Sequence, residues 1–350
     1  MQFDFSEDQR LLQSTVRDFL AGECGPDVVR SLWESETGRS RALWSQLAEV
    51  GLVGALVAES HEGMGLAEVD FVLLCEEVGR AGLAEPVIET AAVAAPLLTE
   101  LGDAELSARW LKPLARGEAI VAVGHPVDAF VGDAHVADLL LIGLGDELHA
   151  LGPSEVALEP QPTNDPARRI QRVTFSPGDT SRVAGGGRAR TLLAAALDRG
   201  ALAAAAQLIG VADRLIELAV AYAKQREQFG VPIGSFQAVK HQLADAKVKL
   251  EYARPLVYRA AWSVAHGLAQ RGVHVSMAKL AAGEAAARAS RTALQVHGAI
   301  GYTWEQDLHI WMRRAGSLAA VWGSPRFHRE RMAEFALADG APLGAGRSFR

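Results

Sequence analysis

The residues best suited to chemistry lie in one unbroken string between Lys224 and Asp245. Arg226 stands near the end of a long apolar segment, and Gln237 stands at the start of the next segment, with a turn rich in Gly and Pro between them. A guanidinium can bind phosphate oxygens in pairs, while an amide side chain offers a donor and an acceptor to sugar hydroxyls. Two helix ends that present these groups together suit a dinucleotide of the flavin type.

The same string reads Arg-x-x-Phe-Gly, then Ile-x-x-Phe-Gln and His-x-Leu-Ala-Asp, and it closely resembles the signature of flavin-dependent acyl-CoA dehydrogenases. In that family the arginine reaches the pyrophosphate of a neighbouring subunit's cofactor, and the glutamine also contacts the flavin. The resemblance therefore implies FAD as the cofactor. It also implies that Arg226, Phe229 and Gln237 bind it.

A second string, residues 295–303, is similar to the family element Gln-Leu-His-Gly-Gly-x-Gly-Tyr, which packs on the adenosine part of the flavin across a subunit interface. Glycine lets a backbone approach a ring or a phosphate closely. The resemblance implies that Gln295, His297, Gly298 and Ala299 contact FAD, although Ala299 replaces the second glycine. Without the family, this string would be a helix C-terminus with its glycine cap.

Residues 313–324 align without a gap on the family segment that ends Tyr-Glu-Gly-Thr, and they place Trp322 where the family has its catalytic glutamate. Oxidation of an acyl-CoA needs a carboxylate that removes the α-proton while hydride leaves the β-carbon for the flavin. An indole cannot accept that proton, so the chain resembles a family member without its usual base. Ser324 is implied as a further cofactor contact.

Some family members carry the glutamate on the first helix of the C-terminal domain instead, in a Leu-x-x-Glu-Arg element. This chain has Ala-Leu-Asp198-Arg199 there. Aspartate is one methylene shorter than glutamate, and a displacement of around 1 Å can cost on the order of a hundredfold in rate. Asp198 is therefore either a replacement base or half of a partly buried ion pair with Arg199.

A further departure follows the strand expected at residues 120–123. Family members continue there with Thr-Glu-Pro and Gly-Ser-Asp elements, a loop that holds the flavin ring and its phosphate side. Here Pro126 leads almost directly to Gly132 and on to Asp138. We expect the flavin loop to be deleted, so that the chain holds a flavin ring poorly by itself.

The elements that must position these residues follow from the apolar pattern. Ser6 and Gln9 predict a capping box at the start of the first helix. A glycine triplet at residues 185–187 predicts a hinge or the start of a helix. Further helices are predicted at residues 43–50, 67–80, 191–228, 236–268 and 273–296. Short apolar runs predict strands at residues 119–123, 136–142, 156–158 and 173–175.

The predicted fold class is mainly α with a small β module. The resemblance implies an N-terminal helical domain at residues 1–117, a truncated middle β domain at residues 118–187, a C-terminal four-helix bundle at residues 188–340 that makes the flavin and oligomer contacts, and a loose tail at residues 341–350. We see no internal repeat.

Composition excludes several function classes. The chain has 350 residues, 49% of them hydrophobic, and a net charge of −7, which gives no basic field for nucleic acid. Cys24 and Cys75 form no disulfide framework. The acidic start is not a signal peptide, and the uncharged run at residues 200–212 is too short to span a membrane, so we expect a buried helix and a cytoplasmic protein. The histidines show no metal-ligand spacing, so no metal is expected.

Three functions remain open. In the first, the chain is a subunit of a heteromeric α2β2 acyl-CoA dehydrogenase, and a homologous full-featured partner supplies the flavin loop and the catalytic glutamate. Such short, base-less chains resemble those of actinobacterial enzymes that act on bulky, steroid-derived acyl-CoA thioesters and pass electrons to an electron-transfer flavoprotein or similar acceptor. In the second, a self-sufficient homotetramer uses Asp198 as its base. In the third, the chain is a non-catalytic scaffold that binds no flavin.

Overall fold

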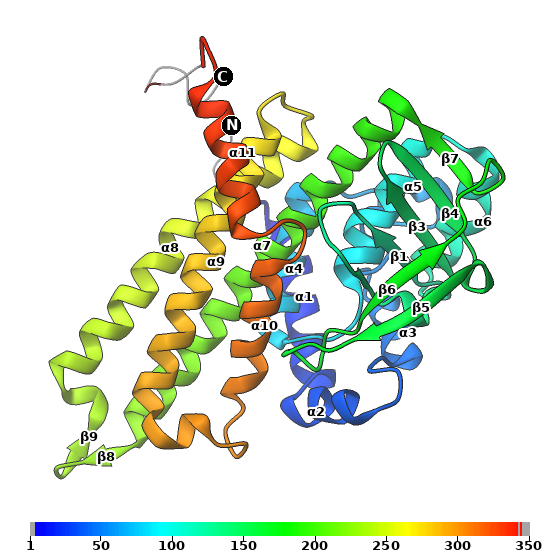
Figure 1. Ribbon diagram of the computed structural model, residues 1–350. Coiled ribbons are helices and arrows are strands. Elements are labelled where there is room, and N and C mark those ends of the chain that lie inside the picture. Colours follow the sequence, from blue (N-terminus) through cyan, green and yellow to red (C-terminus); the bar gives the residue numbers. More distant parts are fainter. Residues whose placement is uncertain (1–3, 342–343, 345–350) are drawn as a thin grey trace.

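The computed structural model describes residues 4–341 and residue 344, and it shows a helical bundle beside a smaller part that contains the sheets (Figure 1). The predicted fold class, mainly α with a small β module, is confirmed. Most of the tail predicted at residues 341–350 lies outside the described residues, as do residues 1–3 at the acidic start of the chain.

The chain begins with a capped helix. Ser6 accepts a hydrogen bond from the backbone N–H of Gln9 at 3.2 Å, and the Gln9 side chain accepts one from the N–H of Ser6 at 2.7 Å, which confirms the predicted capping box. The helices of this first third are α1 (Glu7–Glu23), α2 (Pro26–Glu34), α3 (Arg41–Glu49), α4 (Glu68–Ala81), the π-helix η2 (Val87–Ala94), α5 (Ala95–Leu101) and α6 (Ala104–Ala115).

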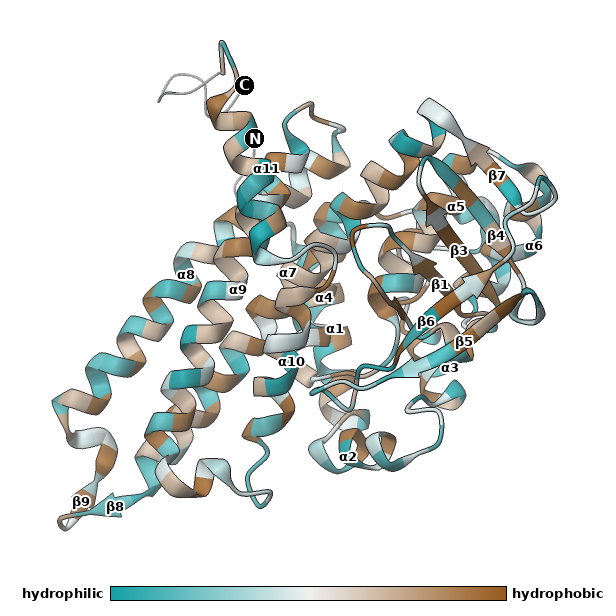
Figure 2. Cartoon of the chain, viewed as in Figure 1, coloured by the Kyte–Doolittle hydropathy of each residue, from teal (hydrophilic) through white to brown (hydrophobic). Residues whose placement is uncertain are grey.

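The β module consists of two sheets with strand orders β1-β3-β4-β7 and β2-β6-β5. Its strands are β1 (Val121–Gly124), β2 (Val131–Gly132), β3 (Leu139–Leu144), β4 (Glu147–Leu151), β5 (Val156–Gln161), β6 (Ile170–Phe175) and β7 (Arg182–Gly185). The apolar strands β1 and β3 pair in parallel inside the module (Figure 2). The run predicted to begin a strand at residue 136 starts with a 3-10 turn, and its strand begins at Leu139.

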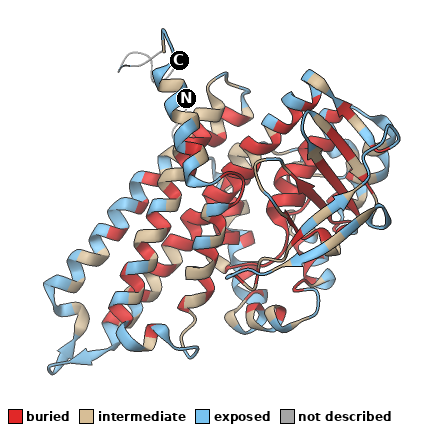
Figure 3. Cartoon of the chain, in the orientation of Figure 1, coloured by how far each residue is buried: buried red, intermediate tan, exposed pale blue. Residues whose placement is uncertain are grey.

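The bundle is formed around one very long helix, α7 (Gly186–Gln225), which Gly185 precedes as its N-cap, so the glycine triplet marks a helix start. The other bundle helices are α8 (Gln237–Ala265), α9 (Arg271–His297), α10 (Leu308–Ala320) and α11 (Pro325–Leu337). Among the described residues, α7 alone is long and apolar enough to cross a membrane, and 83% of its apolar window is buried inside the structure (Figure 3). It is the core helix of a soluble protein.

Helix α7 touches α4 backbone to backbone. A Cβ added to Gly210 would lie 1.8 Å from the carbonyl oxygen of Glu76, and one added to Gly79 would lie 2.0 Å from that of Gln207. Burial raises the pKa of Glu76 to about 7, and its carboxylate accepts a hydrogen bond from Arg254 of α8 at 2.7 Å. Glycine on both helices therefore fixes the axis of α7, which carries residues of both candidate sites described next.

Candidate functional site

The first group of predicted residues gathers where α7 ends and α8 begins, at the far end of the bundle (Figure 1). Arg226 is the C-cap of α7, and Gln237 is the first residue of α8. A hairpin of β8 (Glu227–Gln228) and β9 (Val231–Pro232) joins them and carries Phe229, which is 93% exposed with φ of 56°. Within the described part of the chain, the side chains of Arg226 and Gln237 make no hydrogen bond and no ion pair.

Helix α9 ends at the same end of the bundle. The His297 ring stacks on Tyr222 of α7, one turn before Arg226, with ring centroids 4.2 Å apart. Gly298 follows with φ of 62° and ψ of −140°, a conformation that only glycine adopts easily, and no atom lies within 4 Å of an added Cβ. Gln295 is exposed, as is Ala299.

We call Arg226, Phe229, Gln237, Gln295 and Gly298 the distal cluster. All five are exposed to solvent, whereas most residues of the bundle core are buried (Figure 3). A free guanidinium, two free amides and an open glycine backbone fit the phosphates and hydroxyls of a dinucleotide. The cluster thus fits the dinucleotide half of FAD, approached from outside this chain.

Ser324 lies elsewhere, beside Trp322 near the other end of the bundle. Its hydroxyl accepts a hydrogen bond from the backbone N–H of Phe327 at 3.2 Å and caps the N-terminus of α11. Its observed role is a helix cap, and a cofactor contact at this position remains a prediction. The other predicted cofactor residues lie where α7 ends, α8 begins and α9 ends, whereas Ser324 lies at the start of α11.

The second group surrounds Trp322, in the turn between α10 and α11. Its side chain is only 2% exposed, and its φ is 52°, in a region that bulky residues rarely occupy. The indole lies against Gly200 of α7, where an added Cβ would be 2.1 Å from the ring atom Cδ2. The position at which the resemblance predicted a glutamate therefore faces α7 at Gly200.

Polar groups hold the backbone of this turn from several elements. The N–H of Trp322 donates to the carboxylate of Asp128 at 2.7 Å, and the N–H of Gly323 donates to it at 3.4 Å. The carbonyl oxygen of Trp322 accepts from Nε2 of His328 at 3.0 Å. Burial lowers the pKa of His328 to about 4, so this imidazole is neutral at physiological pH.

Lys279 of α9 holds the end of α10. Its ammonium group donates to the carbonyl oxygens of Ala319 at 3.2 Å and Val321 at 2.7 Å. Its side chain is buried, and burial lowers its pKa to about 7. A cation at a helix C-terminus satisfies carbonyl groups that the helix leaves free. Lys279 therefore positions the residues that immediately precede Trp322.

Asp198 does not face this turn. It is 2% exposed, and its two carboxylate oxygens accept hydrogen bonds from Arg331 at 2.8 Å and Arg271 at 3.2 Å. Asp198 and Gly200 are two residues apart, which is about 200° around a helix axis, so their side-chain directions are opposed. The face of α7 that meets Trp322 is that of Gly200, and the geometry gives Asp198 no support as the base.

The ion pair predicted between Asp198 and Arg199 is not formed. The Arg199 guanidinium instead donates to Glu68 of α4 at 2.7 Å and to Glu100 of α5 at 2.7 Å. Neighbouring residues on a helix point about 100° apart, so each one pairs with whichever element covers its own side. The prediction that Asp198 forms an ion pair is therefore confirmed, but its partners are Arg271 and Arg331 and not Arg199.

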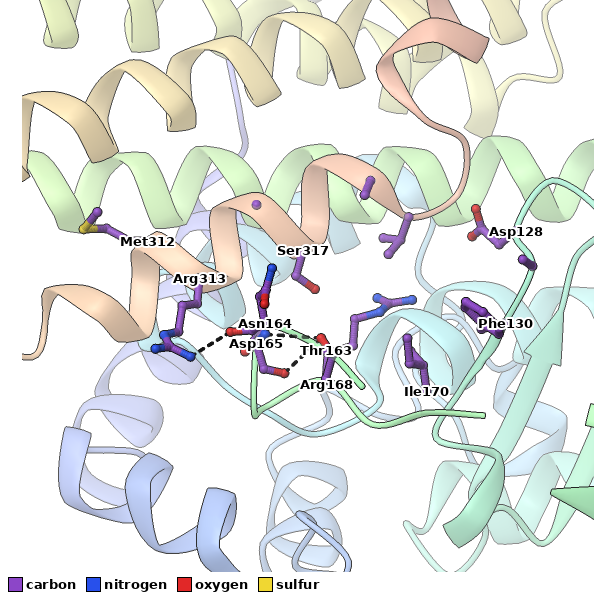
Figure 4. Close-up of a pocket in the computed structure, with 14 residues that line it drawn as sticks. Asp128, Phe130, Thr163, Asn164, Asp165, Arg168, Ile170, Met312, Arg313 and Ser317 are labelled. Carbon is purple, nitrogen blue, oxygen red and sulfur yellow. Dashed lines mark hydrogen bonds between the residues drawn. The ribbon is translucent and has the colours of Figure 1, made fainter. Parts of the chain in front are cut away.

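The segment that replaces the expected flavin loop is short. Only residues 125–130 separate β1 from β2. A pocket of about 570 Å³ lies between this segment, the connection of β5 to β6, and α10 (Figure 4). Arg168 and Phe130 point into it, and the hydroxyl of Ser317 is buried there without a partner among the described residues. Asp165 also lines the pocket; it is buried and pairs with Arg314 at 3.4 Å.

The sequence did not predict the residues that contact the turn between α10 and α11. Gly200, Asp128, Lys279 and His328 belong to no motif, and each lies far along the chain from Trp322 or shows no spacing that would single it out. The one signal available was Trp322 itself, because a bulky side chain that replaces a smaller one in a helical core needs a small residue opposite.

Comparison with known proteins completes the description. Residues 6–118 match the family described as acyl-CoA dehydrogenase, N-terminal domain, and residues 188–337 match acyl-CoA dehydrogenase, C-terminal domain. The chain is 33% identical over 321 residues to the acyl-CoA dehydrogenase IpdE2 of Mycobacterium tuberculosis, covering 91% of this chain and 94% of that protein.

Solved structures give the same result. A chain of the ChsE4-ChsE5 complex from Mycobacterium tuberculosis is 26% identical with a TM-score of 0.86, over 97% of this chain and 100% of that chain. A chain of the Tcur3481-Tcur3483 steroid ACAD is 26% identical with a TM-score of 0.85, over 96% of this chain and 99% of that chain.

Proposed function

The chain belongs to the acyl-CoA dehydrogenase family of FAD-dependent oxidoreductases acting on CH–CH groups, and we propose that it forms one half of a composite site. In this proposal it assembles with a homologous, full-featured subunit as an α2β2 tetramer. The partner contributes the flavin loop and the catalytic glutamate, and this chain contributes its distal cluster to the dinucleotide of the partner's FAD.

The observation that carries this proposal is the pairing of Trp322 with Gly200. Position 322 holds an indole, and the residue of α7 that faces it has no side chain. Neither residue can remove a proton from carbon, because proton abstraction needs a positioned basic group. The base must then come from another chain if the assembly is to oxidise an acyl-CoA.

The distal cluster and the segment at residues 125–130 differ in the contacts that each could make with a flavin. The distal cluster is exposed and has free donors, so Arg226 would bind phosphate oxygens, while Gln237 and Gln295 would bind hydroxyl or ring atoms. The segment at residues 125–130 is short, and its Asp128 binds the chain's own backbone. Bound FAD supplies the hydride acceptor for the reaction; this chain's residues hold and orient its dinucleotide half.

The substrate that we propose is a bulky, steroid-derived acyl-CoA thioester, with an electron-transfer flavoprotein or similar acceptor. Support comes from the similar solved structures: one is a steroid ACAD, and two are complexes of unlike chains. We also propose a cytoplasmic location, in keeping with the soluble core packing of α7.

The test is the ratio of flavin to protein, measured from the visible flavin absorbance for this chain alone and after co-expression with a neighbouring acyl-CoA dehydrogenase gene product. We expect flavin and activity only in the co-purified complex. A full complement of flavin and strong dehydrogenase activity in the lone chain would instead establish a self-sufficient enzyme. A complex in which no flavin binds at any interface with this chain would establish a scaffold.

A further inference from the structure

Arg168 is a charged side chain that the proposed function does not use. It lines the pocket of about 570 Å³ beside residues 125–130 and points into it (Figure 4). Within the described part of the chain, no hydrogen bond or ion pair joins its guanidinium to another residue. A guanidinium carries five N–H donors and no acceptor. Arg168 therefore has its donors available to a ligand that enters the pocket.

The acidic residues around this pocket do not neutralise Arg168. Burial raises the pKa of Glu89, and the opposing effect of Arg168 is smaller, so this carboxyl is a weak counter-ion. The carboxylate of Asp165 accepts hydrogen bonds from Arg314 at 3.4 Å and from a backbone N–H group at 3.1 Å. The carboxylate of Asp128 binds the backbone of the turn between α10 and α11. The pocket thus keeps an uncompensated positive charge.

The connection between β5 and β6 fixes where Arg168 points. The backbone N–H of Arg168 donates to the carbonyl oxygen of Asp165 at 2.8 Å, which closes a tight turn. The next residue, Arg169, donates to the carbonyl oxygens of Trp33 at 2.8 Å and Ser35 at 3.2 Å, and so ties this connection to the end of α2. A side chain on an anchored segment loses little freedom when a ligand binds, which favours binding.

Helix α10 forms another wall of the pocket. It contributes Arg313, Gly316, Ser317 and Ala320, which recur at helical spacing and therefore lie on one face. The hydroxyl of Ser317 is buried and has no hydrogen-bond partner among the described residues. A buried polar group without a partner costs free energy, and an acceptor atom of a ligand would remove that cost.

Apolar side chains complete the lining, namely Phe130, Ile170 and Met312. Small-molecule pockets of this size combine an apolar lining with a few polar groups that fix the orientation of the ligand. A carboxylate matches the planar fork of a guanidinium and also accepts from a hydroxyl. We propose that the pocket binds a free carboxylic acid with a compact apolar body, held by Arg168 and Ser317. This inference goes beyond the proposed function and requires no flavin in this chain.

The test is isothermal titration calorimetry of adamantane carboxylate into the full chain, in the assembly in which it purifies. Adamantane carboxamide has the same body without the charge, and inorganic phosphate has a charge without the body. We expect a dissociation constant of about 1 mM or tighter for the carboxylate, the affinity that ordinary ligand efficiency gives for its size. The carboxamide and phosphate should each bind at least roughly tenfold more weakly.

Variants locate the binding site. Arg168→Gln should weaken carboxylate binding roughly tenfold to a hundredfold, as the loss of a charged hydrogen bond predicts, and Arg168→Lys, which lacks the planar fork, should be intermediate. Ser317→Ala removes a hydroxyl without a partner, so it should fold normally and weaken binding roughly threefold to tenfold. It keeps the test decisive if the arginine variants do not fold. Arg190→Gln is the matched control, because Arg190 is exposed and pairs with Asp146 away from the pocket.

The proposal is wrong if the carboxylate does not bind at about 1 mM, or if the carboxamide or phosphate binds equally well. It is also wrong if the Arg168→Gln and Ser317→Ala variants bind the carboxylate as the wild-type chain does. Displacement of the carboxylate by added FAD would overturn it too, because the pocket would then belong to a flavin site. These measurements need neither turnover nor a partner subunit, so a failure of the proposed function leaves their outcome unchanged.

Discussion

Replacing Gly200 by alanine is a direct test of how Trp322 is accommodated. The new methyl group would lie 2.1 Å from Cδ2 of the indole and 2.5 Å from Cε2, far inside any normal contact. The indole cannot move aside freely, because it is 2% exposed and its backbone is bonded on both sides by Asp128 and His328. Either the ring or α7 must shift.

The expected free-energy change is the difference between two terms. Alanine is favoured over glycine in the interior of a helix by about 1 kcal/mol. Overpacking of a closely packed core costs about 1–3 kcal/mol, and more when a large ring is displaced altogether. Since the clash here involves a rigid bicyclic ring, we expect Gly200→Ala to lower the free energy of unfolding by roughly 1–2 kcal/mol net.

The assay is urea unfolding of the assembled protein, with Gly316→Ala as the control. Gly316 lies inside α10 with no atom within 4 Å of an added Cβ, so the same substitution should be neutral or stabilising there. In a Trp322→Ala background, Gly200→Ala should lose its penalty, because the ring that it clashes with is gone. The reasoning is refuted if Gly200→Ala is as favourable as Gly316→Ala.

Three further predictions concern other residues. Arg226→Ala should weaken flavin binding in the complex by about tenfold to a hundredfold, measured as flavin released on dilution, whereas Arg326→Ala, at an exposed position, should not. Asp198→Asn should lower stability by about 1–3 kcal/mol through its two arginines and leave turnover per bound flavin unchanged; selective loss of turnover would restore it as a base. His328 has a folded pKa of about 4 against about 6.5 unfolded, so stability should fall as pH drops from about 6.5 to about 4, and His328→Gln should flatten that pH dependence in urea titrations.

Local signals in the sequence were sufficient for elements that depend on local physics. The capping box at Ser6 and Gln9 needs only two residues one turn apart, and the buried run at residues 200–212 needs only its composition. The strands at Glu147–Leu151 and Arg182–Gly185 were not predicted, because they are short and mix charged with apolar residues. Pairing with neighbouring strands from elsewhere in the chain, not local propensity, makes them strands.

The candidate site also combines features that local sequence predicts with features that only the tertiary fold determines. The motifs around Arg226 and Gln295 are contiguous strings, so their resemblance to a family could be seen in the sequence alone. That Asp198 points away from Trp322 could not be seen there, because a step of two residues reverses the direction of a helical side chain and no local signal gives the rotation of α7. Asp128 is 194 residues from the turn that it binds, and only the tertiary fold brings the two together.

The tryptophan at position 322 is buried against α7. Removing its indole would leave an apolar space there, and such cavities cost about 24 cal/mol for each Å³ left unfilled. An indole fills that space with apolar area, but only if α7 offers no Cβ beneath it, as at Gly200. The indole at position 322 therefore depends on the glycine at position 200, because any side chain there would displace the ring.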